Sequence, residues 1–417
     1  MKILPPFTST VACLVIAGIT VTITTPVCHG QWKPTKILQM DGDTVGAEWP
    51  AEQQVVTESW NRVAAVPYIV YMPEKDRVLM LVNCDYKLSH QPMTIISDDH
   101  GATWSGPRPV SKDPEVNGAI GLAKCLTYLG EGKLIFSGNE RWFSSDYGET
   151  WQGPVAIPLA TNGQRWGQWD PYLVDRNPTT DAATRVMEAG CNSENGGWDA
   201  PTGYDQGHIR FSMDGGWTWG PNIMVPQWYA ISEVALLRAQ NGNIIAGCRT
   251  AMTREYLGNI DHYDGLGVSI SKDDGATWSP VDRLYGCGRM HPCMVVMPNG
   301  NIVMSYVVRR GYPRDENDFP QFGIEAIVSR DNGESWDIPH RYVLAKWSGN
   351  RKGRKEWYAS CQGTSTVLLP DGSLLTAYGT GYRSQTDKDG RNPSPRDIGL
   401  VHWKPEGAVS SVKTKGS

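Results

Sequence analysis

The clearest pattern of hydrophobic and polar positions along the chain lies in residues 231–249. An apolar run leads to Asn241-Gly242, a preferred pair for a tight two-residue turn, and a second apolar run leads away from it. This pattern predicts a β-hairpin. Because its two strands are antiparallel, Glu233 near the start of the first and Arg249 near the end of the second should lie at the same edge of the sheet. Two opposite charges at the edge of a buried hairpin indicate a functional site.

The same pattern of an apolar strand, a turn and a second apolar strand recurs along the chain. Comparable hairpins are predicted at residues 67–82, 122–137, 233–249, 291–307 and 363–377, and an apolar strand at 170–174 supplies a further unit. No long stretch has clean helical periodicity, and 45 glycines and 28 prolines favour short strands and turns. The pattern therefore predicts an all-β fold built on six hairpins.

A second motif, Ser-x-Asp-x-Gly-x-(Thr/Ser)-Trp, follows five of the hairpins and begins at residues 97, 144, 212, 271 and 329. A spacing of roughly 50–70 residues is typical of propellers and solenoids. Its aspartates can accept the N–H groups of their own turn, its glycines permit a positive φ, and its tryptophans can pack against the strands. We therefore favour turn stabilisation by these aspartates over the alternative, which is the binding of calcium or sugar.

The hairpins and boxes together predict a single domain over residues 31–404, a six-bladed β-propeller of four-stranded antiparallel blades. Residues 405–417 are predicted to form a disordered tail. Lys2 followed by an apolar run at residues 11–19 predicts a signal peptide over residues 1–30, with an uncleaved membrane anchor as the alternative. The mature protein is therefore expected to be secreted or periplasmic and to have no membrane attachment.

Charge and cysteine content narrow the expected partners. A net charge of −5 provides no basic field for nucleic acid. Seven cysteines follow the predicted leader, an odd number that cannot all pair within one chain. Buried thiols are the favoured interpretation, and a bridge between Cys287 and Cys293 is the alternative. No spacing resembles that of zinc ligands, so we expect no bound metal. We also expect no other cofactor and a monomeric protein.

The repeats can be aligned on their own turns. Glu233 and His291 each stand nine residues before the glycine of their turn, and Asp170 precedes a proline as His291 does. These positions begin the innermost strand of each predicted blade, where side chains crowd the axis at one face. Asp170, Glu233 and His291 should therefore converge on one polar pocket at the mouth of the propeller.

Each of these residues also has a structural interpretation. Glu233 and Arg249 could pair only to satisfy buried charge, which by itself proves no chemistry. His291 could hydrogen-bond to neighbouring strands, and Asp170 could cap the segment 166–169. We favour a functional role for Glu233 and leave the choice open for the other two acid–base candidates.

Five such boxes on six blades resemble the sialidase superfamily of Asp-box, or BNR-repeat, propellers, and the resemblance covers nearly the whole mature chain. Members that cleave sialic acid hold the sugar carboxylate with three arginines, because a guanidinium fork matches a carboxylate. They use a tyrosine nucleophile with a glutamate as its base, and an aspartate as the acid/base. On this resemblance, Glu233 and Arg249 look like the glutamate and the second arginine, and Asp85 lies close to the position of the acid/base.

The remaining positions depart from the family pattern. The element that should carry the first arginine reads Ala-Val-Pro at residues 65–67, with Arg62 three residues upstream. The strand that should carry the third arginine reads Gly-Ile-Glu-Ala at residues 323–326, and Thr364 occupies the position of the tyrosine, with Tyr358 nearby. Since these forks are missing, poor hydrolysis of simple sialosides is expected.

The favoured interpretation is a secreted, exo-acting glycoside hydrolase of the sialidase superfamily that removes a terminal sugar, expected to be acidic, from a glycan or polysaccharide. Two of Asp85, Asp170 and Glu233 would supply the acid and the base or nucleophile. The tryptophan Trp169 could provide a surface on which a sugar stacks, and core packing is its alternative role.

An anionic group on that sugar would be held by Arg249 together with Arg62 or Arg289. One alternative function is a lyase acting on uronate-containing polysaccharide, with His291 as the base and an arginine neutralising the carboxylate. The other alternative is a carbohydrate-binding propeller without catalysis. The retained Glu233 and Arg249 argue against the second alternative.

Overall fold

The computed structural model describes residues 31–86, 89–192, 206–251, 263–353, 356–361, 363–381, 383 and 396–407. The predicted signal peptide lies outside these residues, as does the predicted tail from residue 408 onward. Regular structure in the described part is almost entirely β-strand, as predicted, apart from the short helix α1 (Pro114–Ala119) and the 3₁₀ turn η3 (Glu356–Ala359). No helix in the described part is long and apolar enough to cross a membrane.

Four sheets each contain four antiparallel strands that follow one another in sequence. The first contains β3 (Val63–Met72), β4 (Arg77–Tyr86), β5 (Ser89–Ser97) and β6 (Arg108–Pro109), and the second contains β7 (Cys125–Gly130), β8 (Lys133–Ser137), β9 (Arg141–Ser144) and β10 (Gln152–Val155). The third contains β11 (Leu173–Arg176), β12 (Ala183–Asn192), β13 (Gln206–Ser212) and β14 (Ile223–Tyr229). The fourth contains β15 (Ile231–Arg238), β16 (Ile244–Thr250), β17 (Gly265–Ser271) and β18 (Asp282–Tyr285).

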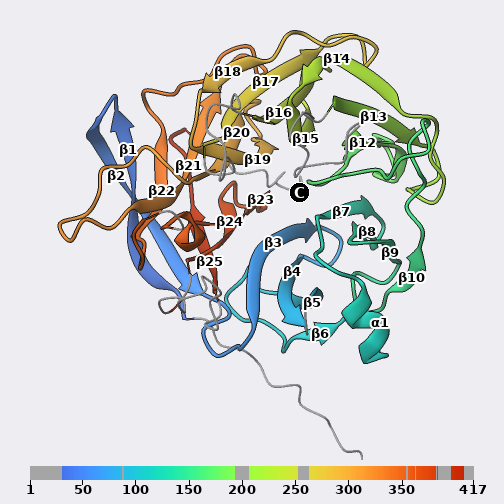
Figure 1. Cartoon of the computed structure of the whole chain (residues 1–417), viewed down its shortest axis with the longest axis horizontal. Helices are drawn as coiled ribbons and strands as arrows, with labels where there is room; N and C mark the ends of the chain where they lie inside the picture. The colour runs from blue at the N-terminus through green and yellow to red at the C-terminus, as the bar shows by residue number, and fades with distance from the viewer. Residues whose placement is uncertain are drawn as a thin grey trace, which may run out of the picture.

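A fifth, nine-stranded sheet completes the arrangement. Its spatial order is β19 (Arg289–Val296), β20 (Ile302–Val308), β21 (Gln321–Ser329), β22 (Tyr342–Ser348), β1 (Lys33–Asp41), β2 (Thr44–Val55), β25 (Ile398–Trp403), β24 (Leu374–Gly379) and β23 (Thr364–Leu368). Figure 1 shows the five sheets around a common centre, with β3, β7, β15, β19 and β23 nearest to it. The molecule is therefore an all-β propeller arrangement.

The nine-stranded sheet differs from the separate four-stranded blades that the sequence predicted. The hairpin of β1 and β2 was not foreseen, and it joins two strand groups because β1 pairs with β22 while β2 pairs with β25. The physical reason lies in the sheet edges, since an unpaired edge strand presents unsatisfied backbone N–H and C=O groups. The N-terminal hairpin satisfies two such edges at once.

The hydrophobic core lies between the faces of neighbouring sheets. One buried cluster, for example, contains Leu79 and Leu81 of β4 together with Leu134 and Phe136 of β8. Burial of a large aliphatic or aromatic side chain contributes about 1.5–3 kcal/mol. The packed faces therefore fix the sheets around the centre and position the ends of their inner strands.

The boxes form the turns that the sequence predicted. In the first box, Asp99 Oδ1 accepts the Thr103 N–H at 2.8 Å and Asp99 Oδ2 accepts the Thr103 hydroxyl at 2.7 Å, while Ser97 Oγ accepts the Gly101 N–H at 2.7 Å. Equivalent bonds form at the other four box aspartates, which are Asp146, Asp214, Asp273 and Asp331. The prediction that these aspartates stabilise their own turns is confirmed.

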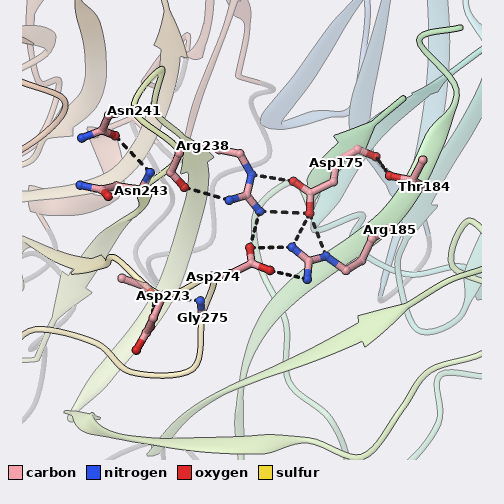
Figure 2. Close-up of polar contacts among 11 residues, drawn as sticks. Asp175, Thr184, Arg185, Arg238, Asn241, Asn243, Asp273, Asp274 and Gly275 are labelled. Carbon is pink, nitrogen blue, oxygen red and sulfur yellow. Dashed lines mark hydrogen bonds and ion pairs between the residues drawn. The ribbon is translucent and has the colours of Figure 1, made fainter. Parts of the chain in front are cut away.

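Neighbouring sheets are also joined by ion pairs. Asp175 on β11, Arg185 on β12, Arg238 on β15 and Asp274 after β17 form one group, which we call the inter-sheet ion-pair cluster (Figure 2). Arg238 donates to Asp175 at 2.7 and 3.0 Å and to Asp274 at 2.8 Å. Arg185 donates to Asp274 at 2.7 Å through two nitrogens and to Asp175 at 2.8 Å. The cluster links the third sheet to the fourth.

Candidate active site

Three candidate site residues share an unusual backbone conformation. Asp170, Glu233 and His291 have φ values of 72°, 48° and 53°, in the left-handed region that L side chains rarely adopt. The strand register shifts beside Glu233 and beside His291, as in a β-bulge, and such a bulge changes the direction of a side chain. Each of these conformations costs on the order of 1–3 kcal/mol, and such strain concentrates at functional sites.

Glu233 and Arg249 meet at one edge of their hairpin, as the sequence predicted. Arg249 Nη1 donates to Glu233 Oε1 at 2.6 Å. The other side of the same guanidinium contacts Asp264, which directly precedes β17, with Arg249 Nε donating to Asp264 Oδ2 at 2.6 Å. All three side chains are buried. Arg249 is therefore held between two carboxylates, and it keeps both of them ionised.

His291 completes this group from β19. Its Nδ1 lies 3.0 Å from Glu233 Oε2, and its Nε2 lies 3.2 Å from Nη2 of Arg309, which follows β20. A guanidinium can only donate hydrogen bonds, so Nε2 must be the accepting nitrogen and the proton must reside on Nδ1. His291 therefore lies between the carboxylate of Glu233 and the guanidinium of Arg309.

Asp170 has a different environment. It stands three residues before β11, its backbone N–H donates to the Lys124 carbonyl at 2.8 Å, and its side chain is buried with Oδ2 lacking any hydrogen-bond partner. Burial raises the pKa of Asp170 well above its ordinary value, and the negative charge of Glu233 raises it further, while Arg249 opposes the shift. Asp170 is therefore favoured as a protonated acid.

Two neighbouring carboxyl groups thus have opposite character. Glu233 accepts from the guanidinium of Arg249 and lies 3.0 Å from Nδ1 of His291, whereas burial raises the pKa of Asp170 well above its ordinary value and favours its protonated form. Environments that separate two titratable groups in this way supply one acid and one base at the same pH. We call Asp170, Glu233, His291, Arg249 and Asp264 the axial cluster, because they lie at or next to the inner strands around the common centre.

Tyr68 of β3 is a site residue that the sequence reasoning missed. It is buried, and burial together with the charges of Asp170 and Glu233 raises the pKa of its hydroxyl well above the ordinary value. The missed signal was a repeat, because Val66-Pro67-Tyr68 has the same order as Asp-Pro-Tyr at residues 170–172. Val66 also has a left-handed φ of 57°, like Asp170.

Asp85 and Arg62 lie together on the first sheet. The Asp85 backbone N–H donates to the Arg62 carbonyl at 2.6 Å, and the half-exposed Asp85 carboxylate lies 3.2 Å from Nδ1 of His90. The side chain of Arg62 is exposed. Within the described ranges, no hydrogen bond or ion pair joins either residue to Glu233. Their roles at the site stay predictions.

Arg289 is engaged inside the nine-stranded sheet. Its Nε lies 3.5 Å from Oε2 of the fully buried Glu325, and its guanidinium stacks 5.0 Å from the ring centre of Tyr285. Burial opposes the charge of Arg289, but Glu325 and nearby tyrosines outweigh it and raise its pKa. The predicted substrate contact of Arg289 stays untested, as does that of Trp169, which is half-buried with Lys124 Nζ 5.6 Å from its ring centre.

Metal and thiol chemistry can be described for the same part of the chain. Among the described residues, no group of three or more His, Cys, Asp or Glu side chains is placed to hold a metal ion. The seven cysteines present there are free thiols. Cys287, which could have bridged to Cys293, is exposed and unbridged.

Solved structures of similar shape cover most of the chain. A protein of unknown function from Dyadobacter fermentans DSM 18053 matches with a TM-score of 0.60 at 14% identity, over 89% of this chain and 99% of that one. The Hadza microbial sialidase Hz136 matches with a TM-score of 0.56 at 12% identity, over 85% of this chain and 68% of that one. The NanB sialidase of Streptococcus pneumoniae matches with a TM-score of 0.55 at 12% identity, over 85% and 70% of the two chains.

The chain has a sialidase-like propeller fold. No protein-family model matches the sequence, and no curated protein is similar to it in sequence. At 12% to 14% identity these likenesses establish the sialidase-like fold and not the chemistry, which depends on the site residues themselves. The fold agrees with the resemblance inferred from the boxes.

Proposed function

We propose that the protein is a glycoside hydrolase that removes a terminal acidic sugar from a glycan. The carrying observation is the contrast between Asp170, buried without a partner for Oδ2, and Glu233, held ionised by Arg249 and His291. Glycoside hydrolysis needs one protonated and one ionised carboxyl group on opposite sides of the bond that breaks. We also interpret the nine-stranded sheet as two blades joined by the N-terminal hairpin, which gives a six-bladed propeller.

In the proposed reaction, Asp170 gives its proton to the glycosidic oxygen as the bond from that oxygen to the anomeric carbon breaks. Glu233 takes a proton from the water whose oxygen joins the anomeric carbon, so the two carboxyl groups exchange protonation states and reset through solvent. His291 and Arg249 orient Glu233 and keep it ionised. Tyr68 stays a neutral phenol, because burial raises its pKa.

The acidic sugar is supported by the arginines around the centre. Arg309 and Arg396 are both buried, and both donate to the same short segment, Arg309 to the Cys361 carbonyl at 3.2 Å and Arg396 to the Ser360 carbonyl at 3.4 Å. Arg309 also contacts His291. We propose that these two arginines face the anionic group, while Arg249 mainly positions Glu233.

Export through a signal peptide at residues 1–30, and action as a monomer without a cofactor, are further parts of this proposal. They are compatible with a glycan substrate outside the cytoplasm. Hydrolysis of simple sialosides is expected to be poor, since residues 65 and 324 are alanine and isoleucine where the family has arginines.

Product analysis tests the proposal. The purified protein is incubated with a panel of sialosides and uronate-containing oligosaccharides in ¹⁸O-labelled water, and the products are identified by mass spectrometry. The expected product is a saturated acidic monosaccharide that carries one ¹⁸O atom at its anomeric carbon. An unsaturated uronate without label would instead establish a lyase, and binding of the panel without any product would establish a carbohydrate-binding propeller.

A further inference from the structure

A cavity lies beside the segment that leads to Asp170. Its volume is about 480 Å³, and its lining includes Lys124, Glu140, Arg165, Trp166 and Gln168. It is formed by the second sheet and by the connection from β10 to β11. A cavity of this size falls within the range of about 300–1,000 Å³ that small-molecule sites occupy.

The cavity adjoins the proposed acid through the backbone. The Lys124 carbonyl accepts the Asp170 N–H at 2.8 Å, and Gln168 stands two residues before Asp170. The proton of Asp170 goes to the oxygen that links the terminal sugar to the next sugar. The next sugar is therefore bound on the side from which Asp170 donates its proton, and this cavity is the one whose lining residue Lys124 contacts the Asp170 backbone.

The positive charge of Lys124 in the cavity lining is not paired with a carboxylate among the described residues. The half-buried ammonium of Lys124 lies 5.6 Å from the ring centre of Trp169. Burial lowers the pKa of Lys124, as expected for a cation without a carboxylate partner. Glu140 is the acid in the lining, and the exposed Arg165 adds a second cation.

Trp166 forms a packed part of the cavity lining. Trp166 is 6% exposed, and its indole Nε1 is buried without a partner among the described residues. One face of the same ring is covered by the guanidinium of Arg210 at 4.2 Å. The cations of Lys124 and Arg165 in the lining are suited to the carboxylate oxygens of a sugar acid.

We propose that this cavity is a second sugar subsite, in which Lys124 binds the carboxylate of the sugar next to the one cleaved at Asp170. This inference rests on the proposed function, because the substrate is the one proposed for hydrolysis. It adds that the leaving group is also an acidic sugar. The preferred substrate then carries a uronate on both sides of the cleaved bond or at least on the leaving side.

Lys124→Met tests the subsite, because methionine keeps most of the side-chain length and removes the charge. The probes are the uronate oligosaccharides of the panel and the same oligosaccharides with their carboxyl groups reduced to alcohols. The ratio of kcat/KM for the carboxylated over the reduced form should fall roughly 10- to 100-fold in the variant, since a charge-assisted hydrogen bond is lost. Lys272→Met is the matched control and should keep the wild-type ratio, because Lys272 forms an exposed pair with Glu334.

Glu140→Gln provides a second, independent test. Removing the acid from the lining should raise the same ratio severalfold, because it eliminates repulsion of the bound carboxylate. An unchanged ratio in both Lys124→Met and Glu140→Gln would overturn the subsite, even if the wild type hydrolyses the substrate. If the wild type hydrolyses nothing, the proposed function fails, and calorimetric titration of the same oligosaccharides must then show the same dependence on Lys124 for the subsite to stand.

Discussion

Charged residues lie at or near both ends of the strands β11 and β15, and the two ends behave differently. At one end, Asp175 and Asp274 are each bound by the guanidinium groups of Arg185 and Arg238 (Figure 2). The two negative charges of the carboxylates are balanced by the two positive charges of the guanidiniums. The hydrogen bonds from Arg185, and secondarily those from Arg238, lower the pKa of Asp274 to about 2. The ion pairs of these carboxylates join the third sheet to the fourth.

At the other end, Asp170 before β11 and Glu233 on β15 are both buried. Arg249 donates a hydrogen bond to Glu233, and no hydrogen bond from an arginine to Asp170 is found among the described residues. Arg249 also binds Asp264, while Oδ2 of Asp170 has no hydrogen-bond partner among the described residues. Burial and the charge of Glu233 raise the pKa of Asp170. The comparison shows that the pKa of a carboxyl group is lowered where burial is slight and matched by pairing, as at Asp274, and raised where burial is not matched, as at Asp170.

The largest expected effect is on catalysis. Asp170→Asn and Glu233→Gln should each lower kcat by about 10²–10⁴-fold, the usual contribution of general acid–base catalysis. Asp175→Asn, a change of the same type at the other end of β11, should leave kcat within about twofold. Steady-state kinetics on the substrate found by product analysis decides this, and equal losses in Asp170→Asn and Asp175→Asn would refute the assignment.

The next effect is on stability. Arg249→Ala leaves Glu233 and Asp264 as buried carboxylates without their shared cation, so it should lower the free energy of unfolding by about 3–5 kcal/mol. Arg238→Ala leaves Asp175 and Asp274 paired with Arg185 in partly exposed positions, so it should lower it by only about 1 kcal/mol. Urea denaturation of both variants measures the difference. Comparable losses would mean that the two clusters are equivalent.

A smaller effect concerns pH. Because the folded-state pKa of Asp170 is raised, its contribution to stability is complete below the ordinary aspartate pKa of about 3.9 and is lost as the pH rises through the raised value. Asp170→Asn removes this titration, so the stability of the variant relative to wild type should increase with pH. Urea denaturation across a pH series tests the sign, and a difference that stays constant with pH would contradict it.

The smallest effect concerns salt. The side chains of Arg238 and Asp274 are 28% and 51% exposed, whereas that of Arg249 is 2% exposed. At 1 M salt the screening length falls to about 3 Å, so the loss caused by Arg238→Ala should shrink to about half its low-salt value. The loss caused by Arg249→Ala should stay the same. Denaturation at low and high salt checks both, and equal salt dependence would show that burial does not separate the clusters.

Local patterns in the sequence predicted much of this molecule. The boxes predicted their own turns because every bond at Asp99 is made within a few residues. Alignment of the hairpins on their turn glycines brought Glu233 and His291 together, and they are in contact. Alignment of the segments around Pro67 and Pro171 would also have added Tyr68 to the predicted site residues.

Features set by contacts between distant segments were not predictable in the same way. The pairing of Arg249 with Asp264 depends on two strands separated by a long insertion, and no short motif marks it. The contact of Arg309 with His291 likewise depends on the position of Arg309 directly after the last residue of β20, and the sequence pattern does not fix where that strand ends. The joining of β2 to β25 depends on backbone pairing between the two ends of the described chain, where periodicity gives strand positions but not partners.

The pairing of β2 with β25 also has a consequence for biosynthesis. Glu52 and His402, which face each other across this pair, are separated by 350 residues. At a translation rate of about 5–20 residues per second, β2 exists for roughly 20–70 seconds before its partner strand is made. The hairpin of β1 and β2 is therefore made with unpaired edges, and the ring can close only after β25 has been made. A prematurely terminated chain retains those exposed edges, which makes it a recognisable target for chaperones and proteases.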